Sequence, residues 1–414
     1  MYVGGRGVFE FFFTRLVGLL FPALILLSLH GKAQAISNEG RDFWLCFPSH
    51  APLVSNNNMS LAEISVFITS KSNSSGKILF RGGSENFTVA ANTVTEVKLP
   101  RGSTYISDGT GINQGMGIHV VVDSDQPKVV VYGHVFAGAR SAATLVLPVE
   151  ALGQRYYAMA YDQGTTEGIS QFQVIAVDGV VHFKVTPVGA PAFSITLQKA
   201  GDVYQYQSVN DVTGAIIEVD KNLSPCNRIA VFSGSSATYI RRAGCNASTV
   251  DPLIQQLYPT ESWGKRYALV PFYNRLEGSI FRVMAAEDNT HITLMGANHI
   301  LDKGEFYTTD PTYQLGILTS DKPISVAQYS LSQQCGFGEL NDPDMVLLNP
   351  LEYSIKDVTM YSAVKQSIQE QYLNVVIPTA KASTFLLNNQ PYSGTFTPFP
   401  DAPELSYTQI ELTG

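Results

Sequence analysis

The sequence predicts an all-β protein built from tandem antiparallel units of the β-sandwich type. Strand-forming residues are abundant, since the chain has 20 Tyr and 22 Phe, whereas charged residues make up only 15%. No amphipathic helical segments alternate with the strand-like runs, which argues against a parallel α/β sheet. A motif at residues 147–156 recurs at residues 257–267, and both copies contain apolar, Pro, x, Glu, x, apolar, Gly, x, Arg, Tyr. This recurrence predicts that one β unit is repeated along the chain.

The repeated motif marks the places where successive units join. A third copy, at residues 349–353, keeps only the Pro-x-Glu core, so the three prolines lie roughly 100 residues apart, the length of a small all-β domain. In each full copy an Arg lies between the Glu and a Tyr, which predicts a Glu–Arg ion pair with the Arg stacked on Tyr. The predicted joint residues are Pro148, Glu150, Gly153 and Arg155; Pro259, Glu261, Gly264 and Arg266; and Pro350 with Glu352.

These joints divide the chain into a leader and four units. Each unit contains about six or seven strand-like runs, which is the content of a two-sheet sandwich. Units merged into a larger layered β domain, or a propeller-like array, remain as alternatives, although a propeller blade has about four strands and a shorter period. The predicted segments are a signal peptide at 1–35 and β units at 36–146, 147–257, 258–349 and 350–414, the last of them truncated.

The leader has the pattern of a secretory signal peptide. Arg6 and Arg15 form a basic start, residues 16–29 are continuously apolar, and Ala33 and Ala35 provide the small residues of a cleavage site. The apolar run is shorter than the 18 or so residues of a membrane-spanning helix. We therefore expect cleavage after Ala35, in preference to an uncleaved anchor, and a mature protein that is secreted or displayed at the cell surface without an integral membrane segment.

Alternating apolar residues predict two hairpins in the first unit. Residues 63–70 and 77–81 form the first expected pair. Residues 117–122 and 129–135 flank a turn rich in Asp and Pro and form the second.

Later units repeat this order. Residues 172–176 align without a gap on residues 281–285, and residues 320–323 read as a closing turn. The fourth unit contains a strand at 372–377 and ends in a strand at 409–412 that has no evident partner. Because an unpaired strand edge invites aggregation, we expect the sequence to be a fragment of a longer protein.

Charge argues against a nucleic-acid partner. Signal cleavage removes three basic residues and one acidic residue, so the net charge falls from −8 to −10, whereas nucleic-acid binding depends on Lys and Arg neutralising phosphates. No basic run is longer than the pair Arg241 and Arg242.

The mature chain contains four cysteines, and export favours disulfides. Cys226 and Cys245 flank one strand-like run and are the first candidate pair, with Cys335 as the alternative partner of Cys245. Cys46 lies in an aromatic stretch, which favours a buried free thiol.

No motif indicates a cofactor or catalytic chemistry. Asp342 and Asp344 are weak calcium candidates because loop carboxylates suit that ion, but their spacing is not that of an EF-hand. His182 and His291 occupy equivalent places in successive units, which predicts a structural role. We therefore expect no cofactor, no firm metal site and no catalytic residues.

Eight short motifs, taken in order, resemble one known family. They are residues 40–44, 257–264, 285–290, 304–307, 320–323, 327–329, 342–345 and 375–379. Together they resemble the N-terminal domain of the IgGFc-binding protein family, and the resemblance extends over residues 40–414. It implies an exported protein related to the bacterial members of the family, without recognised catalytic residues. The family takes its name from a mucus glycoprotein that binds the Fc part of immunoglobulin G.

Three functions remain open at this stage. The first is an exported, non-catalytic binding or adhesion module that recognises an extracellular protein or glycan. The second is a structural spacer that presents a missing C-terminal domain. The third is a secreted hydrolase whose carboxylate pair lies on distant loops. Because no catalytic spacing is present, the first is favoured.

Overall fold

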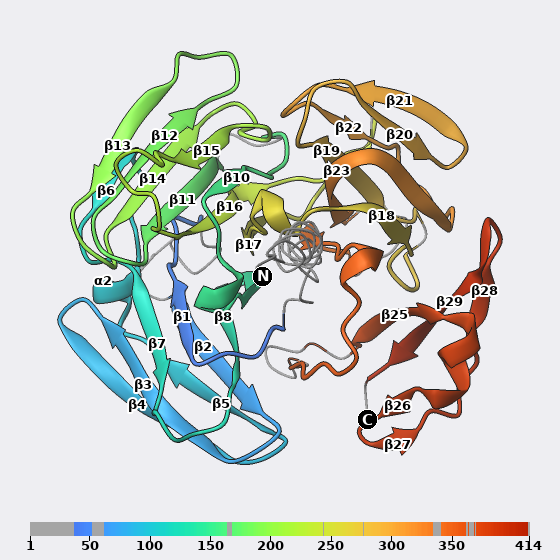
Figure 1. The fold of residues 1–414 in the computed structure, drawn as a ribbon, viewed down its shortest axis with the longest axis horizontal. Helices are drawn as coiled ribbons and strands as arrows, with labels where there is room; N and C mark the ends of the chain where they lie inside the picture. The colour runs from blue at the N-terminus through green and yellow to red at the C-terminus, as the bar shows by residue number, and fades with distance from the viewer. Residues whose placement is uncertain are drawn as a thin grey trace, which may run out of the picture. The chain divides into compact units, whose positions relative to one another are not determined.

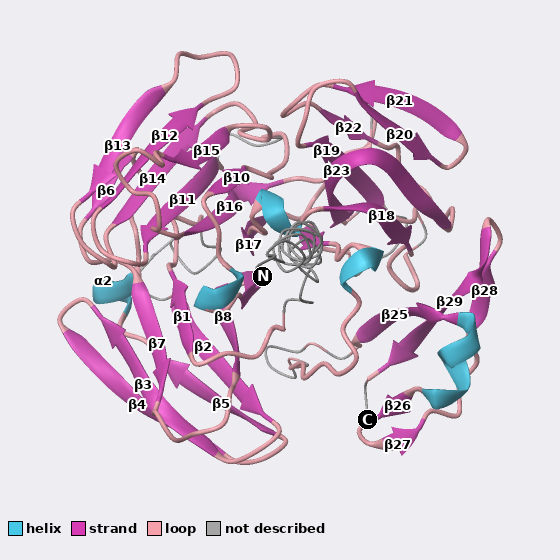
Figure 2. Ribbon diagram, viewed as in Figure 1, coloured by secondary structure: helices cyan, strands magenta, loops and turns pink. Residues whose placement is uncertain are grey.

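The computed structural model confirms an all-β protein. It describes residues 37–412 apart from 52–61, 164–167, 243, 276, 334–340, 362, 364–367 and 369. These residues belong to one compact unit, Ser37–Gly414, and form antiparallel sheets with only short helical turns (Figure 2). The predicted signal peptide lies outside the described residues. In the described part of the chain, no helix has the length and apolar character needed to span a membrane.

The first set of eight strands forms two sheets (Figure 1). One has the order β1-β7-β3-β4 and the other the order β5-β2-β8-β9. The strands are β1 (Asp42–Leu45), β2 (Glu63–Ser70), β3 (Ser74–Phe80), β4 (Gly83–Val89), β5 (Thr93–Lys98), β7 (Ile118–Val122), β8 (Val130–Ala137) and β9 (Arg140–Val146). Between β5 and β7 the chain forms a short helix, α2 (Arg101–Thr104), and a strand, β6 (Gly111–Asn113).

The second set repeats this strand order. Its sheets are β10-β15-β12-β13 and β14-β11-β16-β17, and β6 from the first set adds beside β14. The strands are β10 (Arg155–Tyr157), β11 (Ser170–Ala176), β12 (Val181–Thr186), β13 (Phe193–Leu197), β14 (Val203–Ser208), β15 (Ile216–Val219), β16 (Ile229–Thr238) and β17 (Asp251–Gln256).

The third set has the same strand order. Its 15-residue strand β23 serves as both the sixth and the seventh strand of the set. Its first part pairs with β18 and β20, and its second part pairs with β19 and β24. The strands are β18 (Gly264–Leu269), β19 (Ile280–Ala285), β20 (Thr290–Leu294), β21 (Ala297–Leu301), β22 (Phe306–Thr308), β23 (Gly316–Ser330) and β24 (Asp344–Leu347). Three sets with one topology are what a tandem repeat produces.

The predicted hairpins are wrong. β2 pairs with β5 and β8, whereas β3 pairs with β4 and β7. β7 and β8 also lie in different sheets, and residues 320–323 continue strand β23 instead of forming a turn. In each case the chain crosses from one sheet of a set to the other, so consecutive strands do not pair.

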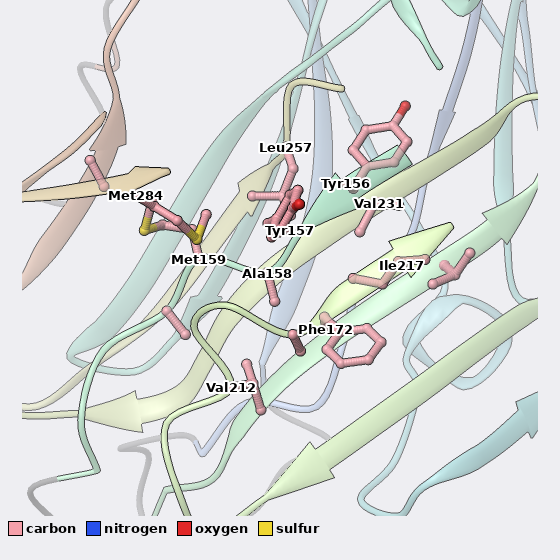
Figure 3. Packing of buried hydrophobic residues seen from close by; sticks show 14 of the residues in the cluster. Tyr156, Tyr157, Ala158, Met159, Phe172, Val212, Ile217, Val231, Leu257 and Met284 are labelled. Atoms are coloured by element: carbon pink, nitrogen blue, oxygen red, sulfur yellow. The ribbon is translucent and has the colours of Figure 1, made fainter. Parts of the chain in front are cut away.

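A hydrophobic core fills the space between the two sheets of the second set (Figure 3). Phe172 and Val231 project from one sheet, Phe183 and Ile217 project from the other, and all four are at most 1% exposed. Burying one such side chain contributes about 1.5–3 kcal/mol. A separate core in the third set includes Phe281 and its neighbours.

The second and third sets also share apolar contacts. Met284 and Tyr329, from the third set, belong to the same cluster as Phe172 and Val231. As a result, β11 and β16 are buried on both faces. Contacts therefore unite the sets into one compact unit, and the boundaries after residues 146, 257 and 349 remain predictions about repeats within it.

The C-terminal part forms a smaller sheet in the order β25-β29-β28. The prediction that the last strand lacks a partner is wrong, because β29 pairs with both neighbours. The elements are β25 (Tyr372–Pro378), the 3-10 helix η6 (Thr379–Thr384), the short pair β26 (Leu386–Leu387) and β27 (Gln390–Pro391), β28 (Thr397–Phe399) and β29 (Ala402–Glu411).

Candidate functional site

Each predicted joint places a glycine of one set directly against a proline that begins the next. The pairs are Gly40 with Pro148, Gly153 with Pro259, and Gly264 with Pro350. A Cβ on these glycines would lie between 2.3 and 2.5 Å from the proline Cβ, so a larger residue requires the joint to shift. Each proline precedes one turn of 3-10 helix: η3 (Val149–Ala151), η4 (Thr260–Ser262) and η5 (Leu351–Tyr353). The three prolines therefore occupy equivalent environments.

At two of these joints, a buried tyrosine forms hydrogen bonds with the backbone. Tyr156 Oη accepts a hydrogen bond from the backbone N–H of Gly153 and donates to the carbonyl of Ile229, both at 2.8 Å. Tyr267 makes the equivalent two bonds in the third set. The sequence motif included these tyrosines, but nothing in it indicated that the hydroxyl groups would satisfy buried backbone.

The predicted ion pair between Glu150 and Arg155 is not formed. Arg155 Nη2 instead donates to Tyr157 Oη at 2.8 Å, and its guanidinium lies 5.4 Å from that ring centre. Its nearest carboxylate is Glu218, with the Nε and Oε1 atoms 3.9 Å apart. The reason is that Arg155 lies on a strand beside Glu218, whereas Glu150 lies on the preceding 3-10 turn.

The second joint differs from its prediction in the same way. Arg266 pairs with Glu404 at 3.3 Å, not with Glu261. The Glu of the motif instead faces the glycine segment of the preceding set: Glu352 Oε1 accepts a hydrogen bond from the backbone N–H of Lys265 at 2.8 Å. Glu352 thus contacts the joint at Gly264, and Glu261 lies in the same way beside Gly153.

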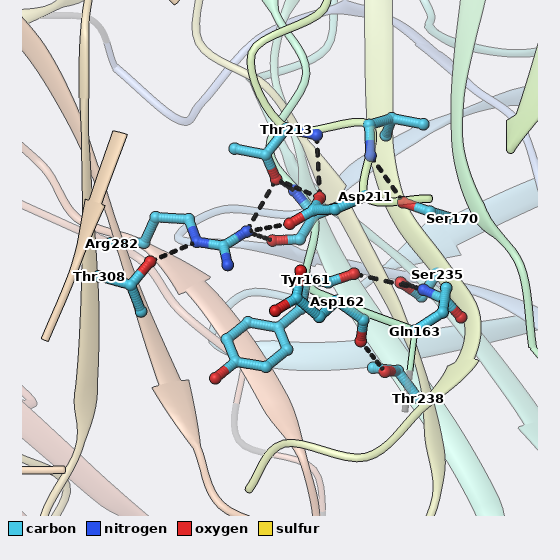
Figure 4. A network of polar contacts seen from close by, with 12 residues as sticks. Tyr161, Asp162, Gln163, Ser170, Asp211, Thr213, Ser235, Thr238, Arg282 and Thr308 are labelled. Atoms are coloured by element: carbon cyan, nitrogen blue, oxygen red, sulfur yellow. Dashed lines mark hydrogen bonds and ion pairs between the residues drawn. The ribbon is translucent and has the colours of Figure 1, made fainter. Parts of the chain in front are cut away.

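A buried cation lies where the second and third sets meet (Figure 4). Arg282 on β19 is 2% exposed, and its Nη1 lies 2.7 Å from Asp211 Oδ2. The same nitrogen donates to the Ala160 carbonyl and to Thr213 Oγ1, both at 2.9 Å, while Nε donates to Thr308 Oγ1 at 3.0 Å. These bonds compensate for removing the charge from water.

Aromatic rings complete the enclosure of this guanidinium. Its carbon lies 4.3 Å from the ring centre of Phe306, 4.8 Å from Tyr161 and 5.8 Å from Tyr329. Contacts of this kind favour a cation over the faces of the rings. Arg282 is therefore a structural ion held between two sets.

The position of Arg282 is polar in other sets as well. The equivalent cross-strand pairs are Gln173 with Gln205, Arg282 with Thr308, and Asn374 with Gln409. Each pair reaches backbone of the preceding set: Gln205 Nε2 donates to the Ser107 carbonyl, and Gln409 Nε2 donates to the Pro271 carbonyl, both at 2.9 Å. A polar side chain thus bonds the backbone of the preceding set at each junction: Gln205, Arg282 and Gln409. We call each of these contacts a polar latch.

The shared topology gathers one group of loops at the same end of the sheets. Because paired strands are antiparallel, the loops after the first, third, fifth and seventh strands of a set lie at the same end. We call this the loop end. In the second set its described parts are residues 158–163, 187–192, 209–215 and 239–250, apart from 243. Loops on a rigid scaffold are where binding residues concentrate.

A pocket of about 470 Å³ opens at this loop end. Its walls are aromatic and polar: Tyr161, Asp162, Gln163, Tyr239, Arg241, Arg242, Gly244 and Cys245. The pKa of Asp162 is raised, first by loss of solvent around the carboxyl group and then by the neighbouring Asp211 carboxylate. Asp211 itself is engaged by Arg282. The two carboxyl groups also share a side-chain hydrogen bond, so Asp162 and Asp211 form one linked acidic pair that Arg282 holds from the other side.

The cysteines correct one prediction. Cys226 is an exposed free thiol, so it does not pair with Cys245, which is disulfide-bonded. The alternative partner, Cys335, lies outside the described residues. Cys46 is a buried free thiol whose pKa is raised by burial, as its aromatic surroundings predicted.

The remaining candidates do not form a site among the described residues. Asp344 Oδ1 accepts a hydrogen bond from the backbone of Met345, and no three His, Cys, Asp or Glu side chains with known positions converge on one ion. The calcium hypothesis for Asp342 and Asp344 therefore gains no third ligand. His182 bonds Thr196, a contact within one sheet.

Fused antiparallel β sets with a polar pocket at their loop end define a protein of the all-β class. Residues 142–414 match the family model described as IgGFc binding protein, so the chain belongs to that family. It is 24% identical over 285 residues to the IgGFc-binding protein of Homo sapiens. The match includes 66% of this chain and 5% of that relative, so the chain spans only a small part of the human protein's length.

Proposed function

We propose that the chain is an exported, non-catalytic binding module that recognises an extracellular protein or its glycan. The observation that carries this proposal is membership of the IgGFc-binding family over residues 142–414. The human relative is named for binding the Fc part of immunoglobulin G. Signal cleavage after Ala35 belongs to the same proposal, because an extracellular partner requires export. Intact-mass analysis of protein recovered outside the cell tests it, and the expected mature chain begins at Ile36.

The loop end supports this role. Tyr313 and Val209 project from its loops with 61% and 76% exposure, and exposed aromatic and apolar side chains on loops are suited to protein contacts. At the opposite end, Leu223 is exposed to a similar degree, 63%. Equal exposure at opposite ends provides a matched pair of positions for mutagenesis.

A binding panel tests the proposal directly. The mature chain is immobilised and probed with immunoglobulin Fc, Fab and a glycan array. We expect at least one of these classes to bind, and Tyr313→Ser to weaken that binding at least fivefold while Leu223→Ser leaves it unchanged. Equal effects of the two variants would place the partner elsewhere, and no binding across the panel would refute the proposal.

A second candidate function is a structural spacer that presents another domain. Its support is the series of Gly–Pro contacts and polar contacts at successive joints, because such joints hold neighbouring sets rigidly against each other. A spacer predicts no ligand in the panel and a fixed distance between labels on the first and third sets, measured by electron-spin resonance. The binding module requires a ligand, so the panel separates the two.

A further inference from the structure

The pocket at the loop end of the second set has the size and composition of a small-ligand site. Its volume of about 470 Å³ lies within the range usual for such sites. Residues 161–163 form one wall, and residues 239, 241, 242, 244 and 245 form another. Among its eight lining residues, Tyr161 and Tyr239 provide rings, and most others provide polar groups. An apolar ligand would leave these polar groups unpaired.

Gln163 provides a fixed acceptor in this wall. Its Nε2 donates to Ser235 Oγ at 2.8 Å and to the Tyr161 carbonyl at 3.3 Å, which orients the amide. Its Oε1 is buried and accepts no hydrogen bond from the part of the chain that the structure describes. A buried acceptor without a donor is costly, so a ligand that supplies a hydroxyl group would satisfy it. Asp162 adds a carboxyl group to the same wall; one hydrogen bond of this group goes to Asp211, which leaves its remaining acceptor sites for a ligand.

Arg241 provides the cation. It is exposed, and none of the ion pairs found among the described residues includes it. Its neighbour Arg242 is already engaged, with its Nε atom 3.1 Å from Glu277 Oε2. A planar guanidinium with free donors suits a carboxylate, which it can bind through two parallel hydrogen bonds.

We propose that this pocket binds a sugar residue that carries a carboxylate. The carboxylate lies against Arg241, hydroxyl groups donate to Gln163 Oε1 and to Asp162, and the ring of the sugar contacts Tyr239. This inference rests on the proposed binding function, because it names the ligand chemistry of the same loop end. Neither the family match nor the human relative's name assigns such a site.

Calorimetry with defined ligands tests the inference on the mature protein. The probes are sialyllactose, neutral lactose and the dipeptide Glu-Glu, which separates an acidic sugar from an acidic peptide. We expect sialyllactose to bind at least tenfold more tightly than the other two. Arg241→Met should weaken sialyllactose binding at least tenfold, whereas Arg241→Lys should lose less. Arg81→Met is the control, because Arg81 is exposed and bonds Gly102, outside the pocket.

Several results would overturn the inference. Equal binding of lactose removes the role of the carboxylate, tighter binding of Glu-Glu assigns the site to peptides, and absence of all binding removes the site. Thermal unfolding of Arg241→Met checks that the variant is folded. If Arg241→Met binds the immunoglobulin and glycan panel like wild type, the general function stands and the pocket assignment fails. If the panel and the calorimetry are both negative, the proposed function fails together with the pocket assignment.

Discussion

The guanidinium of Arg282 and the carboxylate of Asp211 form an ion pair of 2.7 Å that joins the third set of strands to the second in almost complete burial. Arg282→Met should therefore lower the free energy of unfolding by about 3–5 kcal/mol, because removing one partner leaves a buried charge unpaired. Urea unfolding monitored by intrinsic fluorescence measures the change.

Arg266→Met is the matched control for this prediction. Arg266 also pairs with a glutamate, Glu404, but both side chains are substantially exposed, so we expect a loss below about 1 kcal/mol. In addition, Arg282→Met combined with Asp211→Leu should recover part of the lost stability, since no charge is then left buried. Similar losses for Arg282→Met and Arg266→Met would show that burial does not determine the effect.

The latch around Arg282 illustrates what the sequence does not reveal. The alignment of residues 172–176 with 281–285 correctly made Arg282 the equivalent of Gln173, because repeated strands preserve register. The alignment did not indicate that side chains at these positions form hydrogen bonds with the preceding set. Their partners are backbone carbonyls and loop residues, which no spacing motif in the sequence marks. Arg241 shows the same limit: the basic pair was visible, but Gln163 and Asp162, which share its pocket, lie on a distant loop.

The sequence also predicted the wrong pairing between strands. The all-β class and the joints depend on composition and local motifs, which a sequence contains directly. Alternating apolar residues instead define which face of a strand is buried, and they do not choose between a hairpin and a crossing to the facing sheet. β7 and β8 show this, because their loop has turn residues yet joins two different sheets.

Adding a single methyl group to the glycine at a joint should lower the stability of the fold. Gly153→Ala places a Cβ 2.5 Å from Pro259 Cβ and 3.0 Å from a carboxylate oxygen of Glu261, so we expect a loss of about 1–3 kcal/mol from overpacking. Differential scanning calorimetry measures it. Gly102→Ala is the control, because that Cβ meets no atom within 4 Å and alanine favours helix α2. An unchanged melting temperature for Gly153→Ala would refute tight packing at the joint.

The disulfide of Cys245 can be assigned chemically. The remaining expectation from the sequence is a bond to Cys335, which would close a loop of roughly 90 residues and stabilise the fold by about 4–5 kcal/mol in the chain-entropy model. A peptide map without reduction should yield one linked pair containing these two cysteines. Cys245→Ser should lower the urea midpoint, whereas Cys226→Ser should not, because Cys226 is a free thiol. A linked peptide containing Cys226 would contradict both expectations.

His50 should make stability depend on pH in the acidic range. The side chain is fully buried, and burial, followed by the charge of Arg101, lowers its pKa from 6.5 to about 4. Its Nε2 lies 3.2 Å from Arg101 Nη1, and Nδ1 lies 3.1 Å from the Pro48 carbonyl. The neutral ring can donate from Nδ1 and accept at Nε2, whereas a protonated ring would place two cations in contact.

Because the folded pKa of His50 is depressed, the unfolded chain binds more protons between pH 4 and 6.5, and the folded state loses stability as pH falls through that window. The full effect is about 3 kcal/mol. Carboxylates also titrate there, so the measurement is a difference: between pH 7 and pH 4, wild type should lose about 3 kcal/mol more unfolding free energy than His50→Gln, which has no titrating ring. His299→Gln, at a partly exposed histidine, should follow wild type. Parallel pH curves for wild type and His50→Gln would mean that the His50 ring is not held neutral by its surroundings.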